Sequence, residues 1–272
     1  MAIRAVFIDI DGTLINWEEK ISPSVRRELS RIHQQGCEVV LCTGRTRYTA
    51  EPVLNLLPFN GQFLVCSNGA VVIDVSREEV LQRVLLADDQ AKEIVQLILE
   101  SGATPYVYND ATSPGLDSAA VLYPPSMPIG DFAESPRYQP HDNLEFNIPF
   151  QPVSVAAFDS AKLLRPLADR LKLKGEGRFA VIQSGNEFSW GVEVYNKGVS
   201  KRMGVETMAN HLGIKREEIL AIGDHMNDIE MIQWAGVGVA MGNALPEVKE
   251  VANWVTRSNS EDGVAIALNK FV

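Results

Sequence analysis

The chain has 272 residues, of which 46% are hydrophobic and 22% are charged, and this composition excludes a disordered protein. The length allows one large domain or two smaller ones. Asp and Glu outnumber Lys and Arg by 35 to 25, so the net charge is −10. An acidic surface repels phosphate backbones, and we therefore expect no nucleic-acid partner. A phosphorylated metabolite stays compatible with this charge if a divalent cation reverses the field inside one cleft.

Neither a membrane span nor a secretory leader is expected. No window of about 18 consecutive apolar residues occurs, and Met1–Arg4 leads directly into a strand-like segment. The three cysteines have no CxxC spacing and stand among apolar residues, so we expect buried thiols: Cys37, Cys42 and Cys66. The sequence predicts a cytoplasmic protein.

The first eighty residues alternate between strand and helix patterns. Residues 5–8 form a continuous apolar run, which is typical of a strand covered on both faces. Ser22-Pro23 then predicts a helix start, apolar residues follow at helical spacing, and Gly36 predicts the end of the helix. Strands are expected at 38–42 and 63–66, with a helix at about 50–57 between them. This βαβαβ order predicts a mostly parallel sheet.

The same alternation returns near the C-terminus, with strands expected at 219–222, 237–240 and 253–256 and a helix at about 228–234. Between the two halves, eight of the fourteen prolines fall in 114–152, which excludes long regular elements there. Helices at 88–100 and 160–171 and strands at 153–158, 179–183 and 190–194 predict a small α/β unit. We expect an α/β fold: a doubly wound, Rossmann-like core over 1–82 and 191–272, and an inserted α/β domain over 83–190.

Two carboxylates follow the first predicted strand. Asp9 and Asp11 begin on one face because side chains alternate along a strand, and Gly12 then permits a sharp turn. A cation would keep one carboxylate ionised and leave the other to carry a proton. The alternative is a turn in which these residues only satisfy backbone groups. An EF-hand loop is excluded, because Leu14 and Lys20 stand where Gly and Glu are needed.

Polar residues also follow two later strands. Thr43-Gly44 offers a hydroxyl and an unobstructed N–H, which suit phosphate oxygens, although a capped turn would explain the pair equally well. Two more carboxylates and an amide come after residue 222: Asp224, Asn227 and Asp228. Four acids at one sheet edge require a cation, and the all-oxygen set favours Mg²⁺ over zinc. His225 has no second His or Cys to join it, so we interpret it as a loop residue.

A cation is also expected for the substrate phosphate. Lys197 and Lys201 lie near the start of a predicted helix, and either could serve, since an average helical Lys is solvated. Lys201 falls within the first helical turn and is the preferred candidate.

These residues resemble the four ordered motifs of the haloacid dehalogenase superfamily of phosphatases. The motifs are Asp9-x-Asp11-Gly-Thr-Leu, Thr43-Gly44-Arg45, Lys201 and Gly-Asp224-x-x-Asn227-Asp228, with Ser67-Asn68-Gly69-Ala70 after the third strand. The resemblance covers the whole chain. The insertion looks like the α/β cap of the Cof-like subfamily, type IIB, whose members mostly hydrolyse phosphorylated sugars and other small metabolites.

The resemblance implies a role for each motif. Asp9 would be the nucleophile that forms an aspartyl-phosphate, and Asp11 would be the general acid and base. The implied Mg²⁺ ligands are Asp9, the main-chain carbonyl of Asp11 and Asp224, with Asp228 completing and orienting this set. The implied phosphate-binding groups are the N–H groups of Ile10 and Gly44, Thr43, Lys201 and Asn227.

Two other functions are compatible with the same motifs. A phosphomutase or phosphotransferase would pass the phosphoryl group to a sugar hydroxyl, and a non-catalytic protein would only bind a phosphorylated effector. The sequence does not identify the substrate. Tyr106, Tyr108 and Asn109 of the insertion are candidates for contact with a sugar, but ordinary strand-end positions would explain them equally well.

Overall fold

A computed structural model describes residues 2–110, 119–122, 138–141, 150–185 and 190–272. The chain forms two compact units, which we call unit 1 (Met1–Arg83 with Ser200–Val272) and unit 2 (Val84–Val199). The sequence predicts that the chain returns to the first unit at residue 191, whereas in the structure it returns at Ser200. The reason is strand β11 (Trp190–Asn196), which pairs with two strands of unit 2 over its whole length.

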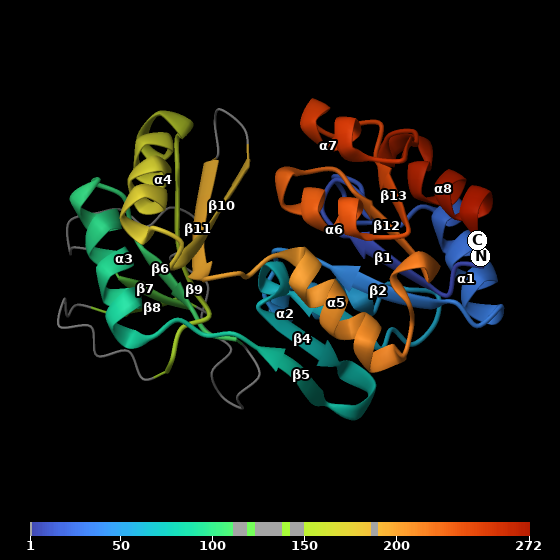
Figure 1. The fold of residues 1–272 in the computed structure, drawn as a ribbon, viewed down its shortest axis with the longest axis horizontal. Coiled ribbons are helices and arrows are strands. Elements are labelled where there is room, and N and C mark those ends of the chain that lie inside the picture. The colour runs from blue at the N-terminus through green and yellow to red at the C-terminus, as the bar shows by residue number, and fades with distance from the viewer. Residues whose placement is uncertain (1, 111–118, 123–137, 142–149, 186–189) are drawn as a thin grey trace. The chain divides into compact units, whose positions relative to one another are not determined.

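Unit 1 is built on one sheet of eight strands in the order β14-β13-β12-β1-β2-β3-β4-β5 (Figure 1). Six of these strands are parallel, and the β4–β5 hairpin adds two antiparallel strands at one edge. The strands are β1 (Ala5–Asp9), β2 (Glu38–Cys42), β3 (Phe63–Cys66), β4 (Val71–Asp74), β5 (Glu79–Arg83), β12 (Ile219–Gly223), β13 (Val237–Ala240) and β14 (Trp254–Val255). This sheet confirms the predicted α/β class.

Six helices connect or follow these strands: α1 (Pro23–Gln34), α2 (Arg47–Leu54), α5 (Lys201–Leu212), α6 (Ile229–Trp234), α7 (Pro246–Val251) and α8 (Gly263–Phe271). The predicted cap of α1 is present, because Ser22 Oγ accepts the Val25 N–H at 3.2 Å. Helices α1 and α8 lie side by side (Figure 1), and α5 packs on β2 to β5 and on α6. Helices α7 and α8 and the β4–β5 hairpin were not predicted from the sequence pattern.

The centre of unit 1 is apolar because its middle strands are covered on both sides. All five residues of β1 are buried, and so are the last four of β2. Burying a large aliphatic or aromatic side chain contributes about 1.5–3 kcal/mol, so these strands form a stiff support for the residues that follow them. The three cysteines are free and buried, as predicted.

Unit 2 contains a six-stranded sheet in the order β10-β11-β9-β6-β7-β8, antiparallel except for the β7–β8 pair. Its elements are α3 (Asp88–Glu100), β6 (Tyr106–Tyr108), β7 (Ala119–Leu122), β8 (Tyr138–His141), β9 (Ser154–Asp159), α4 (Ala161–Gly175), β10 (Phe179–Gly185) and β11. Apolar residues of α3 and α4 pack with Val107, Val155 and Val192 on one face of the sheet. Most of the Pro-rich stretch 114–152 lies outside the described residues. Within the described ranges, no helix combines the length and apolar character needed to cross a bilayer.

Candidate active site

The candidate residues gather at one edge of the unit 1 sheet. Strands β12, β1, β2 and β3 are neighbours and parallel, so their carboxyl ends lie at the same edge. Asp9 ends β1, Thr43 follows β2, Ser67 follows β3 and Asp224 follows β12. Ligand sites of doubly wound sheets lie outside such strand ends. The topology therefore brings together residues from opposite ends of the sequence, such as Asp9 and Asp224.

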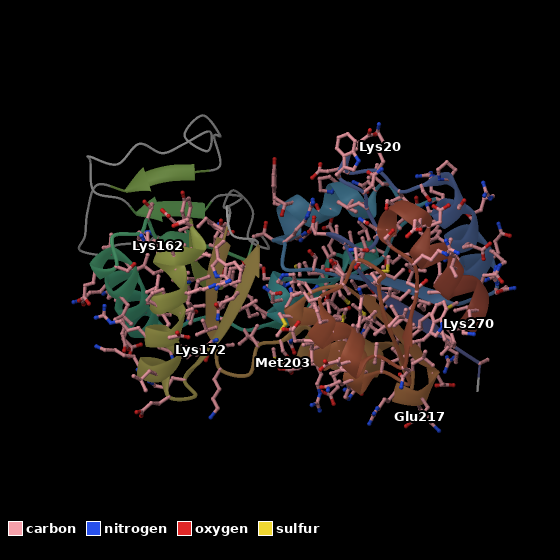
Figure 2. All side chains as sticks on the ribbon, turned by 90° about the horizontal axis from the view of Figure 1, so that it is seen from above. Lys20, Lys162, Lys172, Met203, Glu217 and Lys270 are labelled. Carbon is pink, nitrogen blue, oxygen red and sulfur yellow. The ribbon has the colours of Figure 1, made fainter. Side chains whose placement is uncertain are left out.

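A buried lysine joins two of the aspartates. Most lysines project into solvent, as Lys20 and Lys270 do in Figure 2, whereas Lys201 is only 1% exposed. Its Nζ donates to Asp9 Oδ1 at 2.5 Å and to Asp228 Oδ1 at 2.6 Å. Lys201 is the first residue of α5, and Ser200 caps this helix by accepting the Met203 N–H. The structure thus brings Lys201 into the cluster, while Lys197 is exposed and belongs to unit 2.

Asp228 is fully buried, and both of its carboxylate oxygens have donors. Oδ1 accepts from Lys201, and Oδ2 accepts the backbone N–H groups of Asp224 and His225, each at 2.9 Å. These bonds shape the loop that carries Asp224. Asp228 therefore holds Lys201 and the backbone of Asp224 and His225 in place, and each of its carboxylate oxygens already accepts a hydrogen bond.

Asp224 is held from both sides. Thr13 Oγ1 donates to Asp224 Oδ1 at 3.1 Å, and Asn243 Nδ2 lies 3.4 Å from Asp224 Oδ2 and donates to the Gly12 carbonyl at 2.8 Å. Gly12 has φ +81°, and a Cβ there would lie 2.4 Å from Asp224 Oδ2. Only glycine allows the turn after Asp11 to approach Asp224 this closely.

Asp11 faces away from the buried cluster and pairs with an arginine. Arg45 donates to both Asp11 oxygens, from Nε at 2.9 Å and from Nη2 at 2.6 Å, and the same Nη2 lies 3.2 Å from Glu19. The Asp11 side chain is 55% exposed, whereas the Asp9 residue is 5% exposed. The two carboxylates predicted to share a pocket therefore occupy very different environments.

The remaining candidates for phosphate binding lie beside the cluster. Thr43 is fully buried, and its Oγ1 accepts the Arg45 N–H at 3.0 Å. Ile10 directly follows β1 and is buried. Asn227 Nδ2 donates to Asn68 Oδ1 at 2.8 Å, and the Asn68 amide also lies against Gly44.

Comparison with known proteins assigns the family. Residues 6–268 match the haloacid dehalogenase-like hydrolase family. The chain belongs to this family. The YxeH protein of Bacillus subtilis (strain 168) is 33% identical, and the alignment covers 99% of this chain and 98% of that protein. The family predicted from the ordered motifs is thereby confirmed.

Two further matches extend this result. The 5-amino-6-(5-phospho-D-ribitylamino)uracil phosphatase YcsE of the same organism is 29% identical, with 99% of this chain and 96% of that protein covered. The crystal structure of a haloacid dehalogenase-like hydrolase from Bacteroides thetaiotaomicron gives a TM-score of 0.81 at 26% identity, covering 99% of this chain and 100% of that one. Family and relatives together confirm the expected enzyme class, a phosphatase of the haloacid dehalogenase family.

The cluster of Asp9, Asp224, Asp228 and Lys201 contains three carboxyl groups and one ammonium group. Burial raises the pKa of Asp9 well above its usual range; Lys201 opposes this shift, while Asp228 and Asp224 add to it. Burial and then Asp228 raise the pKa of Asp224 to about 6. Burial lowers the pKa of Lys201, but the Asp228 and Asp9 carboxylates outweigh this effect, so its pKa is raised and the side chain stays charged. One lysine does not balance three aspartates.

A divalent cation fits this deficit of positive charge. Ligand atoms of Asp9, Asp224 and Asp228 lie within 4.8 Å of one another, and all are carboxylate oxygens. Mg²⁺ favours one or two carboxylates together with water and substrate oxygens, at about 2.0–2.1 Å. Asp9 and Asp224 suit this role better than Asp228, whose oxygens already accept three donors. The Asp11 side chain lies with Arg45, so only its main-chain carbonyl remains as a candidate ligand.

His225 is not among the candidate metal ligands, which are Asp9, Asp224 and Asp228. Burial lowers its pKa, so the imidazole is neutral, and its Nδ1 is buried without a hydrogen-bond partner among the described residues. Thr13 and Asn243 contact Asp224, and Asn68 contacts Asn227, but the sequence assigned no role to these three residues. Asn243 comes three residues after β13, so the rule that selected Asp224 could have found it. Thr13 lies beyond a turn whose closure depends on residues distant in the sequence.

Proposed function

We propose that this hydrolase is a Mg²⁺-dependent phosphatase that cleaves the phosphomonoester of a sugar or sugar alcohol through an aspartyl-phosphate on Asp9. The arrangement of Lys201 with Asp9 supports this proposal most directly. A buried carboxylate at a strand end, held by a buried lysine and faced by a second carboxylate, is a poor structural ion pair, because desolvation opposes it. It is a suitable place for an anionic phosphoryl group that arrives with a divalent cation.

The first step is attack by a carboxylate oxygen of Asp9 on phosphorus. The P–O bond to the leaving alcohol breaks, and Asp11 gives the departing oxygen its proton. A water molecule then attacks the phosphorus of the aspartyl-phosphate, Asp11 accepts the proton of that water, and inorganic phosphate leaves. Asp9 and Asp11 return to their starting states.

The different environments of the two carboxylates fit these different roles. Asp9 is buried and held by Lys201, whereas the Asp11 side chain is exposed and paired with Arg45. Both Asp11 oxygens accept hydrogen bonds from Arg45, so proton donation to the leaving group requires Asp11 to leave Arg45. We assign the positioning of phosphoryl oxygens to Thr43, Lys201, Asn227 and the N–H groups of Ile10 and Gly44.

We assign Mg²⁺ to the carboxylates of Asp9 and Asp224 and the main-chain carbonyl of Asp11. When bound, the ion would neutralise negative charge on the transferring phosphoryl group. Asp228 would keep Asp224 and Lys201 in place through the bonds described above. The substrate class rests on the relatives: YcsE is named for an ester of a ribityl chain, and it is 29% identical to this chain. We propose that unit 2 is the cap that selects the leaving group.

The experiment is phosphate release from sugar phosphates, sugar-alcohol phosphates, nucleotides and cofactor phosphates, with Mg²⁺ and with EDTA. The Asp9→Asn protein serves as the blank. We expect a few esters to react with kcat/KM near or above about 10⁴ M⁻¹s⁻¹. If every phosphoryl group removed from the ester is recovered as inorganic phosphate, and none is transferred to an added sugar, the enzyme is a hydrolase and not a mutase or transferase. No ester above the blank would refute the proposal.

A further inference from the structure

Three residues in a row after β3 adopt a backbone conformation that side chains rarely take. Ser67 has φ 49°, Asn68 has φ 53° and Gly69 has φ 93°. Glycine reaches this left-handed region without strain, and asparagine is among the few other residues that tolerate it. Ser67 and Asn68 are only 2% and 1% exposed, so contacts within the protein, and not contacts with water, hold them in this conformation. A strained, buried segment beside a site persists only when its surroundings hold it.

The surroundings of this turn are the elements of the proposed phosphate site. The Ser67 N–H donates to the Arg45 carbonyl at 2.8 Å, and the Asn68 N–H donates to the Thr43 carbonyl at 3.0 Å. A Cβ on Gly69 would lie 2.1 Å from the Ser200 carbonyl oxygen, so the turn touches the residue that caps α5. Gln82 of β5 donates to the Gly69 carbonyl at 2.7 Å. The turn therefore contacts both the loop of Thr43 and the start of the helix of Lys201.

The side chain of Asn68 completes these contacts. Its Oδ1 accepts from Asn227 Nδ2 at 2.8 Å. Its amide also lies against Gly44, because a Cβ on Gly44 would meet Asn68 Nδ2 at 3.2 Å and Oδ1 at 3.3 Å. An amide group has two N–H donors in one plane, so a bond from one of them fixes the direction of the other. Asn68 thus sets the orientation of the Asn227 amide.

We infer that Asn68 is a positioning residue of the phosphate site, acting through Asn227. The left-handed backbone is required because it turns the Asn68 side chain back between Gly44 and Asn227. This inference rests on the proposed function, since it assigns Asn227 to a phosphoryl oxygen. It adds a component from a fourth strand, β3, to a site built from the ends of β1, β2 and β12.

A glycine substitution tests the side chain without straining the backbone. Asn68→Gly keeps the left-handed conformation accessible and removes only the amide. Glu78→Gly is the matched control, because Glu78 has φ 53° and ψ 34° against 53° and 30° for Asn68, and it is exposed at the end of a short turn. Any general effect of a new glycine on stability appears in both proteins.

The measurements are kcat and KM for one ester and the inhibition constant of inorganic phosphate, with the melting temperature as a check of folding. We expect Asn68→Gly to lower kcat/KM about tenfold and to weaken inhibition by phosphate by a similar factor, as the loss of one orienting hydrogen bond would do. Glu78→Gly should match the wild-type protein in both. Wild-type values for Asn68→Gly would overturn the inference.

A double-mutant cycle decides whether Asn68 acts through Asn227. We expect Asn227→Ala to lose activity, and we expect the addition of Asn68→Gly to cause no further loss. If the second change lowers kcat/KM by its full factor, Asn68 acts by another route and the inference fails. The proposed function fails separately, when the wild-type and Glu78→Gly proteins hydrolyse no ester at all.

Discussion

The two units use their sheets in opposite ways. In unit 1 the sheet faces are apolar, and the polar side chains stand at the strand ends, where Asp9, Lys201 and Asp228 are nine-tenths buried or more. In unit 2 one sheet face packs on α3 and α4, and the other carries Tyr106, Tyr108 and Phe158. A strand end offers a few fixed groups, and a sheet face offers a wide surface. This difference is consistent with our proposal that unit 1 performs the reaction and unit 2 selects the ester.

Changes to the nucleophile should affect every ester equally. We expect Asp9→Asn to lower kcat by at least about 10⁴-fold, because no other carboxylate is held at that position. The substitution removes one of three clustered carboxylates, so the melting temperature should stay the same or rise. Steady-state assays on several esters check this, and a residual activity that differed strongly between esters would contradict the division between the units.

The effect of replacing the proposed general acid, Asp11, should depend on whether the leaving group needs a proton, and not on the shape of the leaving group. We expect Asp11→Asn to lower kcat by about 10²- to 10⁴-fold for a sugar phosphate, and by much less for p-nitrophenyl phosphate, whose leaving group needs no proton. Comparing both substrates across the wild-type and variant proteins measures this. Equal losses with the two substrates would show that Asp11 has a different role.

Substitutions on the aromatic face of the unit 2 sheet, which carries Tyr106, Tyr108 and Phe158, should alter substrate preference more than the maximal rate. Phe158 is 39% exposed, and its ring lies 5.5 Å from that of Tyr106 in an edge-on contact. We expect Phe158→Ala to raise KM for preferred esters by about three- to tenfold, a typical effect of losing an aromatic contact, with little change for p-nitrophenyl phosphate. Leu173→Ala, at a 74% exposed position of α4, is the control. A uniform fall in kcat would argue against a selective role.

The smallest expected effect concerns stability and pH. The raised pKa of Asp9 and Asp224 means that the folded protein binds more protons than the unfolded chain between their ordinary pKa and the raised one. Without metal, these groups therefore make the protein less stable as the pH rises through about 6. Mg²⁺ binds the ionised carboxylates, so its stabilising effect should grow over the same range.

Thermal melts with and without Mg²⁺ at pH 5 and pH 7.5 measure this effect. We expect Mg²⁺ to raise the melting temperature by several degrees at the higher pH, about what saturating ligand gives a protein of this size, and by less at the lower pH. In Asp224→Asn the difference between the two pH values should shrink. An equal rise at both pH values would place the metal elsewhere.

The sequence predicted the parts of this fold that depend on local pattern. The bounds of β2, β3 and α3 agree with the structure, because buried apolar strands and a helix with a regular apolar face have strong signals of their own. The β4–β5 hairpin was missed, since β5 is a largely exposed edge strand. In the site, the carboxylates followed from the strand-end rule. The pairing of Asp11 with Arg45 and the place of Asn68 could not be predicted, because both depend on contacts between loops of different strands.

The Gly69 turn has a further consequence for how the chain is assembled. Gln82, next to the point where the chain leaves unit 1, bonds to the Gly69 carbonyl, and Ser200, where the chain returns, touches the same glycine. The excursion from residue 84 to residue 199 thus begins and ends beside Gly69, and none of the strands described within it joins the unit 1 sheet. A short linker from residue 83 to residue 200 would join the two segments of unit 1 into one continuous chain at little entropic cost. Segments inserted at this spot can therefore change in length and composition without altering the sheet that carries the carboxylates.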